Sequence, residues 1–243
     1  MVIFGVLFLR AWGREWKIMR YWRTLARQKE TVQNWTGQDI LPQYQSLYQA
    51  NHDFVGWLSV DGTHVDFPIM QTKNDPEYYL WRDFDGEERN FGMPFVDYRC
   101  DVSPVRSFNT IIYGHNGIFT DLFNYASPNA LYRVNPYIRF DTLTETGVYE
   151  VSAVFYANGK DARLLFPWDP EDEQAYEFYN YIEVDSIDGF RKYAEKIEQN
   201  RFYSTQAPLT ADSHVLTLVS CAMRVSYDGD ENWRFVVVAK QVQ

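Results

Sequence analysis

Three side chains at the ends of apolar, β-branched runs have the types that thiol chemistry needs. The run Thr217–Ser220 leads into Cys221, and a second apolar run begins at Arg234. If the two runs pair as neighbouring strands, the thiol and the guanidinium lie side by side. Far upstream, the run 110–114 leads into His115. A cysteine, a histidine and an arginine at strand ends indicate a nucleophilic thiol site.

The chemistry of such a site follows from the three residue types. A free cysteine has a pKa of about 8.5, so attack on an amide requires a base or a nearby positive charge. His115 can supply either, and Arg234 offers several fixed donors on a group that stays charged. Each residue also has a structural interpretation, because a strand cysteine is often a small core residue and a strand-end arginine is often a surface charge. The residues alone leave both interpretations open.

Several motifs resemble those of the class B sortases, a protein family found in Gram-positive bacteria, and they follow one another in the family's order. The motifs at the three side chains are Asn109–His115, Thr217–Cys221 and Arg234–Lys240, and those before them are Val55–Leu58, Asp66–Gln71, Asp75–Leu80 and Phe91–Asp97. The resemblance covers roughly residues 40–243. Two departures stand out: Ser220 replaces the usual threonine, and the segment before Arg234 is a few residues longer than usual. Arg234 is therefore assigned from the strand that follows it.

The resemblance implies a reaction and a role for each residue. Cys221 is the nucleophile, His115 protonates the departing amine and deprotonates the incoming one, and Arg234 binds the substrate carbonyl or its oxyanion. The implied reaction cleaves a C-terminal sorting signal of an Asn-Pro-x-Thr-like kind after the threonine. The resulting thioester is resolved by an amine of a cell-wall precursor or a pilin. No cofactor is implied, since all three groups are side chains.

The resemblance also implies residues that contact the sorting peptide. The residues of this predicted groove are Asp66, Met70, Val219 and Ser220. Ordinary strand packing would explain the same four positions equally well.

Two other functions stay open from the sequence. A cysteine protease would hydrolyse the thioester, although its usual order places the cysteine before the histidine, the reverse of His115 and Cys221. A non-catalytic wall-binding module could use a barrel of the same kind.

Composition narrows the class of protein. A chain of 243 residues with 46% hydrophobic and 18% aromatic residues fits one globular domain with appendages. The net charge of −10 is unevenly spread, because residues 1–30 hold seven Lys and Arg against two Glu. The strongly acidic remainder predicts no binding to nucleic acid, which requires a basic surface.

The remaining cysteine and histidines predict neither a disulfide nor a metal site. Cys100 lies in a polar stretch that indicates an exposed loop, and we expect an incidental, unpaired thiol there. The other histidines, His52, His64 and His214, show no zinc-ligand spacing. An acidic cluster at 169–173 lacks the ligand spacing of a calcium loop.

The N-terminus predicts a separate segment. We divide the chain into residues 1–36, apolar then amphipathic and close to a membrane, and residues 37–243, the catalytic domain. The apolar run Met1–Leu9 falls short of the about 20 residues that a spanning helix needs. Residues 12–26 place tryptophans at helical spacing among basic residues, which suits an anionic membrane surface or packing on the domain. The resemblance implies an N-terminal anchor. We therefore expect the protein to be located at the cell membrane, with its catalytic domain outside the cell.

The rest of the chain predicts a mainly β fold with helical additions. Eight short apolar runs argue for a closed or nearly closed, antiparallel-rich, sortase-like barrel. The runs are Val55–Val60, His64–Met70, Gly92–Val96, Asn109–Tyr113, Tyr137–Phe140, Val148–Tyr156, Val215–Ser220 and Phe235–Val242. Before them, side chains at 44–48 predict a short helix. Apolar side chains at 190–197 have helical spacing and predict a helical insertion before the cysteine strand, capped near Asp185 or Ser186.

Overall fold

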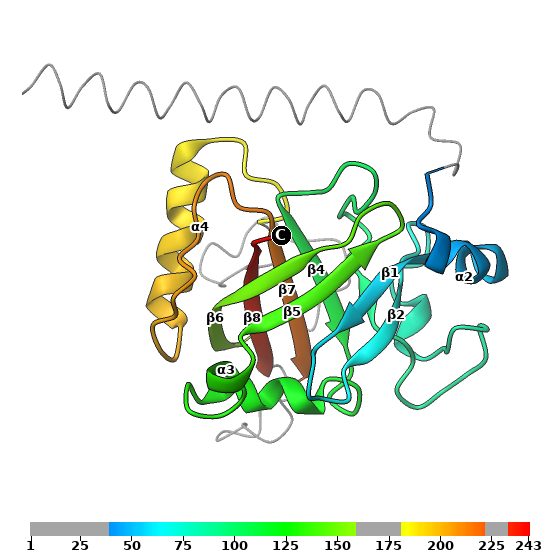
Figure 1. The fold of residues 1–243 in the computed structure, drawn as a ribbon, viewed down its shortest axis with the longest axis horizontal. Coiled ribbons are helices and arrows are strands. Elements are labelled where there is room, and N and C mark those ends of the chain that lie inside the picture. The colour runs from blue at the N-terminus through cyan, green and yellow to red at the C-terminus, as the bar shows by residue number, and fades with distance from the viewer. Residues whose placement is uncertain (1–38, 159–180, 222–232) are drawn as a thin grey trace, which may run out of the picture.

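The computed structural model describes residues 39–158, 181–221 and 233–243 (Figure 1). Their eight strands form one closed barrel in the order β1-β2-β3-β4-β7-β8-β6-β5. The strands are β1 Phe54–Ser59, β2 Asp66–Met70, β3 Phe95–Val96, β4 Asn109–Gly114, β5 Tyr137–Thr142, β6 Val148–Asn158, β7 Val215–Cys221 and β8 Trp233–Gln241. The mainly β fold, the eight strands and the closed barrel are confirmed.

Neighbouring strands are antiparallel except at two places. β2 pairs with β3 in parallel, and β4 pairs with β7 in parallel from Asn109↔Val215 to Gly114↔Ser220. β4 and β7 are buried along nearly their whole length. This burial explains their uncharged, largely apolar sequences, since a strand that faces water on one side alternates between polar and apolar residues instead. β5 shows such an alternation.

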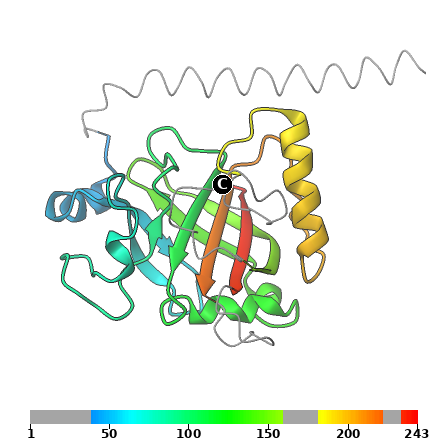
Figure 2. The same cartoon turned by 180° about the vertical axis from the view of Figure 1, so that it is seen from behind.

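One long helix stands beside the barrel wall. α4 (Ile187–Asn200) begins where the sequence predicts, because the Ser186 side chain accepts a hydrogen bond of 3.0 Å from the Gly189 amide. Its side chains Tyr193 and Ile197 are buried, and the ring of Tyr193 lies edge-on to that of Phe108. Figure 2 shows α4 along the side of the barrel. The predicted helical insertion before the cysteine strand is confirmed for this helix.

Shorter helices lie beside the barrel and at one of its ends. The α-helices are α2 (Gln45–Ala50) and α3 (Leu131–Val134), and the 3-10 helices are η2 (Pro42–Tyr44), η3 (Tyr78–Leu80) and η4 (Thr120–Ala126). α2 lies beside β1, while η4 and α3 lie together at the end of the barrel to which β4 and β7 point (Figures 1 and 2). The helical turns predicted at 44–48 are confirmed.

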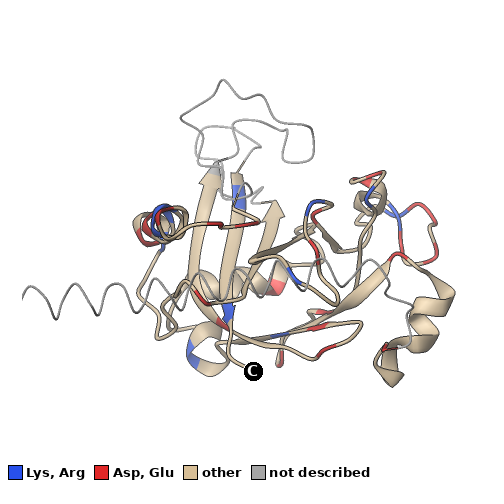
Figure 3. Ribbon diagram, turned by 90° about the horizontal axis from the view of Figure 1, so that it is seen from above, with Lys and Arg blue, Asp and Glu red and all other residues tan. Residues whose placement is uncertain are grey.

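Charged residues lie mostly on the helices and loops, and the strands are largely uncharged (Figure 3). β7 carries no charged residue, and β8 carries only Arg234 and Lys240, near its two ends. Arg234, at the start of β8, is thus a charged residue beside strand β7, which, like its own neighbour β4, carries none.

Cys100 is buried, so the predicted exposed loop cysteine is wrong. Its side chain is 0% exposed and its Sγ lies 3.4 Å from the Asn109 carbonyl oxygen. Burial raises the pKa of this thiol to about 12, with a smaller contribution from the negative charge of Asp97. The polar neighbours misled the prediction, because Arg99 and Asp97 pair with each other at 2.8 Å and do not draw the chain into water. Neither cysteine forms a disulfide.

The expected location at the cell membrane is wrong on the structure. Across 39–158, 181–221 and 233–243, no helix has the length and apolar character needed to cross a bilayer. The predictions for Met1–Leu9, for the amphipathic helix 12–26 and for the acidic cluster 169–173 fall outside the described residues.

Candidate active site

The predicted thiol and guanidinium are direct cross-strand neighbours. β7 and β8 pair antiparallel, and their register ends at Cys221↔Arg234. Residues opposite each other in such a pair have Cβ atoms about 5 Å apart and point to the same face. Both residues are partly buried, and Arg234 Nη1 donates to the carbonyl of Trp233 at 3.1 Å. The prediction that these two runs pair is confirmed.

The third predicted residue lies at the same end of the barrel. In the parallel pair of β4 and β7, Gly114 is level with Ser220. His115 follows Gly114 and Cys221 follows Ser220, so both come one residue after the last matched pair. The structure therefore brings the cysteine and the arginine to the same edge of the barrel as the histidine, which precedes them by more than a hundred residues.

The His115 ring is fixed on three sides. Its Nε2 lies 2.7 Å from the carbonyl oxygen of Leu80, the last residue of η3. The ring centroid is 4.9 Å from that of Trp81 and 6.3 Å from that of Phe91. These contacts could not be predicted from the sequence, because Leu80, Trp81 and Phe91 belong to the long connection between β2 and β3.

The turn after His115 is also held to the cysteine strand. Asn116 Nδ2 donates to the carbonyl oxygen of Cys221 at 3.1 Å. The amides of Ile118 and Phe119 donate to the His115 carbonyl at 3.0 and 2.9 Å. Gly114 allows the close approach of Phe119, since a Cβ there would lie 2.6 Å from that ring. Asn116, which follows the predicted histidine directly, is thus a site residue that the sequence did not single out.

The four predicted groove residues do not form one exposed surface. Met70 and Val219 are buried, at 0% and 2% exposure. Ser220 is buried too, and within the described part of the chain its Oγ has no hydrogen-bond partner. Asp66 is exposed, begins β2 at the end opposite Met70, and accepts from Trp57 Nε1 at 2.6 Å. Only Val219 and Ser220 adjoin Cys221.

The other histidines have partners or surroundings of their own. His64 Nδ1 lies 2.9 Å from Asp121 Oδ2, and hydrogen bonds from the His64 backbone and ring lower the pKa of that carboxyl. Burial lowers the pKa of His214. Within the described ranges, no group of three or more His, Cys, Asp or Glu side chains could hold a metal ion.

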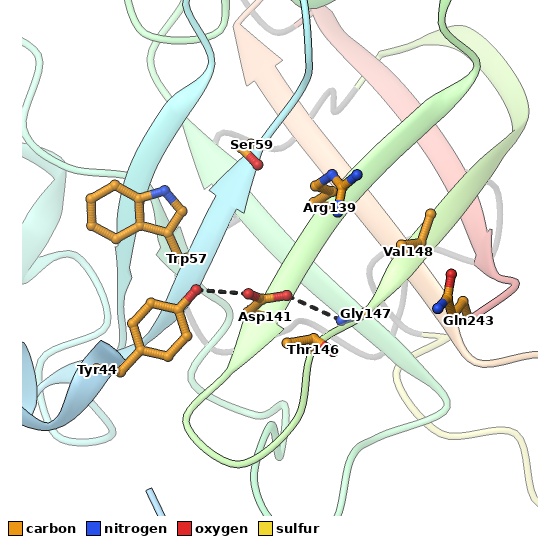
Figure 4. Close-up of a pocket in the computed structure, with 9 residues that line it drawn as sticks. All are labelled: Tyr44, Trp57, Ser59, Arg139, Asp141, Thr146, Gly147, Val148 and Gln243. Carbon is orange, nitrogen blue, oxygen red and sulfur yellow. Dashed lines mark hydrogen bonds between the residues drawn. The ribbon is translucent and has the colours of Figure 1, made fainter. Parts of the chain in front are cut away.

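A polar pocket lies on another wall of the barrel. It has a volume of about 300 Å³ and is lined by residues of β1, β5 and their neighbours (Figure 4). Asp141 accepts from the hydroxyl of Tyr44 at 2.7 Å and from the amide of Gly147 at 3.1 Å. β1 and β5 are on the side of the barrel opposite β7, so this pocket is separate from the cysteine, histidine and arginine.

Comparisons with known sequences and with solved structures both find sortase B proteins. The chain is 29% identical over 210 residues to Sortase B of Listeria monocytogenes, covering 84% of this chain and 76% of that protein. It is 24% identical over 249 residues to Sortase B of Staphylococcus aureus, covering all of this chain and 92% of that protein. No family model matches the chain.

Solved sortase B structures share the fold. Sortase B from Bacillus anthracis in complex with AAEK1 matches with a TM-score of 0.67 and 28% identity, over 85% of this chain and 87% of that one. The Staphylococcus aureus sortase B–substrate complex matches with a TM-score of 0.69 and 23% identity, over 96% and 97%. In its closed barrel and in its sequence, the chain is thus similar to the class B sortases, a family of cysteine transpeptidases.

Proposed function

We propose that Cys221, His115 and Arg234 carry out the transpeptidation. The direct pairing Cys221↔Arg234, with His115 directly after β4 and level with the cysteine, is the observation that supports this assignment. A guanidinium beside the thiol provides donors where the oxyanion forms, and it keeps its charge throughout the reaction. A histidine at the same edge is the usual partner of a nucleophilic cysteine.

The proposed reaction has two halves. The Cys221 thiolate attacks the substrate carbonyl, Arg234 stabilises the oxyanion, and His115 gives a proton to the departing amine. This breaks the amide and leaves a thioester on Cys221. An incoming amine then attacks the thioester carbonyl and gives up a proton to His115. The thiolate leaves, a new amide forms, and the enzyme returns to its starting state.

The proposed donor substrate is a C-terminal sorting signal of an Asn-Pro-x-Thr-like kind, cleaved after the threonine. The proposed acceptor is an amine of a cell-wall precursor or of a pilin. The relatives named Sortase B support a sorting peptide as substrate, and a substrate complex of one of them, with the same fold, has been solved. We propose that Val219 and Ser220 shape the peptide groove beside Cys221. Met70, being buried, would act only through packing, and Asp66 would be a contact remote from the thiol.

We also propose that residues 37–243 are the catalytic domain and that residues 1–36 are a separate segment. The contacts that attach the described N-terminal residues to the barrel begin inside the proposed domain. Ile40 is buried, and the amide of Leu41 donates to the carbonyl of Leu143 at 2.7 Å.

The reaction can be tested with sorting peptides carrying a fluorophore and a quencher. Cys221→Ala is expected to abolish cleavage of every peptide that the wild type cleaves. Cys100→Ala, which removes the other thiol at a buried site, is the matched control and should retain cleavage. Mass spectrometry should show the acyl group on Cys221, and added amine should divert the product from acid to amide. Turnover by Cys221→Ala would refute the assignment, and a product that ignores added amine would indicate a hydrolase.

A further inference from the structure

Two large exposed aromatic side chains lie beside His115. Trp81 is 53% exposed and Phe91 is 57% exposed, and both are among the few large apolar side chains that the described residues leave in water. Exposed aromatic side chains that lie together call for an explanation, whereas single scattered ones do not. Here both rings approach the same histidine.

The loop that carries the two rings is internally braced. Trp81 and Phe91 stand at its two ends. The amide of Arg89 donates to the carbonyl of Trp81 at 2.9 Å, and Arg89 Nε pairs with Asp83 at 2.8 Å. The amide of Met93 donates to the carbonyl of Tyr79 at 2.9 Å. These bonds hold both ends of the loop, so the rings are presented to His115 by a fixed backbone.

The ring of Phe91 also rests on the turn that follows the histidine. A Cβ at Gly117 would lie 3.0 Å from the nearest atoms of this ring. Trp81 meets the imidazole at an interplanar angle of 49°, and Phe91 meets it edge-on at 70°. The imidazole is thus confined by two rings from one loop and by the backbone of its own turn.

The hydrogen bond to Leu80 fixes which nitrogen carries the permanent proton. A carbonyl oxygen only accepts, so His115 Nε2 must be the donor across the 2.7 Å contact. In the neutral imidazole the other nitrogen, Nδ1, then has the free lone pair. A ring flip would break the bond to Leu80 and would have to pass the two aromatic rings.

We propose that Trp81 and Phe91 are positioning residues that clamp His115 in the Nε2–H tautomer, so that Nδ1 is the atom that exchanges protons with the substrate amines. The proposal rests on the catalytic role proposed for His115. The rings themselves need not touch the reacting atoms: they prevent rotation of the imidazole, and the Leu80 carbonyl selects its tautomer.

The tautomer can be read by nitrogen-15 NMR on the full chain with labelled histidine. The chain has four histidines, and His115→Gln assigns the signal of interest by its disappearance. His115 is expected to show the Nε2–H pattern. His64 is an internal reference of the opposite kind, because its Nδ1 donates to the carboxylate of Asp121. Its neutral form should show the Nδ1–H pattern in every variant.

Removing a ring should disturb the histidine without unfolding the protein, because both rings are largely exposed. Trp81→Leu is expected to mix the two tautomers of His115 and to lower kcat about 10-fold, part of the 10² to 10⁴ that a positioned acid or base supplies. KM should change little, since peptide binding does not use the tautomer. Trp81→Phe keeps a ring and should restore most of the Nε2–H pattern of His115 and most of kcat. Phe202→Leu, an exposed aromatic that contacts Tyr156 elsewhere, is the matched control and should change neither.

Two results would overturn the clamp. One is a wild-type His115 in the Nδ1–H form. The other is a Trp81→Leu, Phe91→Leu double variant, folded by circular dichroism, whose His115 tautomer and kcat match those of the wild type. Failure of the proposed function looks different: His115→Gln would keep its activity, while the NMR pattern of wild-type His115 would still report whether the clamp exists.

Discussion

The two cysteines show how surroundings divide one residue type between two roles. Cys221 is partly exposed beside a guanidinium, whereas Cys100 is enclosed between strands and has its pKa raised to about 12, chiefly by burial. A thiol buried in this way remains protonated at neutral pH and is a poor nucleophile. The difference lies in the packing around each thiol. The apolar run before Cys221 and the polar run before Cys100 do not reveal that packing.

The raised pKa of Cys100 predicts a pH dependence of stability. The folded state holds the Cys100 proton more tightly than the unfolded state, whose thiol titrates near its ordinary value. The stabilisation from this group is therefore complete below the ordinary thiol pKa and is lost as pH rises from about 9 towards about 12. Urea unfolding at several pH values should show a steeper fall in the free energy of unfolding for the wild type than for Cys100→Ala. Parallel curves for the two proteins would contradict the prediction.

Arg234 offers a test of the oxyanion donor. Arg234→Lys keeps the positive charge but loses the planar set of donors, so kcat should fall on the order of 10²-fold. Peptide affinity should change much less. Arg139→Lys is the matched control and should behave like the wild type, because Arg139 pairs with Val148 at the start of β6, whereas Arg234 pairs with Ala157 near its end. A near-normal kcat in Arg234→Lys would assign the oxyanion to another donor.

At the scale of elements, the turn after β4 is joined to the end of β7 by one side chain. Asn116 donates to the carbonyl of Cys221, so the loop bearing His115 and the strand bearing the nucleophile are tied directly. A typical hydrogen bond of this kind contributes about 1 kcal/mol to stability. Its position should matter more for catalysis, because it sets the distance between two reacting groups.

Asn116→Ala is therefore expected to lower kcat about 10-fold, in line with the sensitivity of catalysis to small displacements. The loss of thermal stability should be small. Asn135→Ala provides the comparison, because Asn135 Nδ2 also donates to a backbone carbonyl, that of Asp61, at 2.9 Å. Asn135→Ala should lose at least as much stability, since Asn135 Oδ1 also accepts from the Tyr137 amide at 3.0 Å, and only Asn116→Ala should lose activity. Equal activity in both would show that the tie is merely structural.

The sequence predicted elements well where local signals agree with the fold. The eight strands and the Ser186 cap of α4 follow from β-branched runs, turn residues and a capping side chain, which act over short distances. The pairing of Cys221 with Arg234 followed because the two runs are close along the chain. Trp81 and Phe91 escaped prediction, since only the folded β2–β3 connection carries them to His115. Cys100 escaped it because its polar neighbours satisfy one another.

For the whole molecule, the proposed domain division predicts that residues 1–36 are dispensable for folding and catalysis. A chain of residues 37–243 should keep the melting temperature and peptide turnover of the full chain. A chain beginning at residue 51 is the informative comparison, since it loses buried Ile40 and Tyr44 and the 2.7 Å bond from Tyr44 to Asp141. It should melt at a lower temperature. Loss of folding or activity in 37–243 would refute the proposed domain division.

The strand order also sets when the enzyme becomes competent. β7 takes its place beside β4, a strand about a hundred residues earlier, and β8 then closes the barrel between β7 and β6. Pairings between such distant segments form late and slowly, because a large loop must close first. A chain still emerging from the ribosome already holds His115 and, later, Cys221, but Arg234 joins them only with the last strand. Pairing of β8 with β7 and β6 is therefore the folding step that completes the proposed catalytic site.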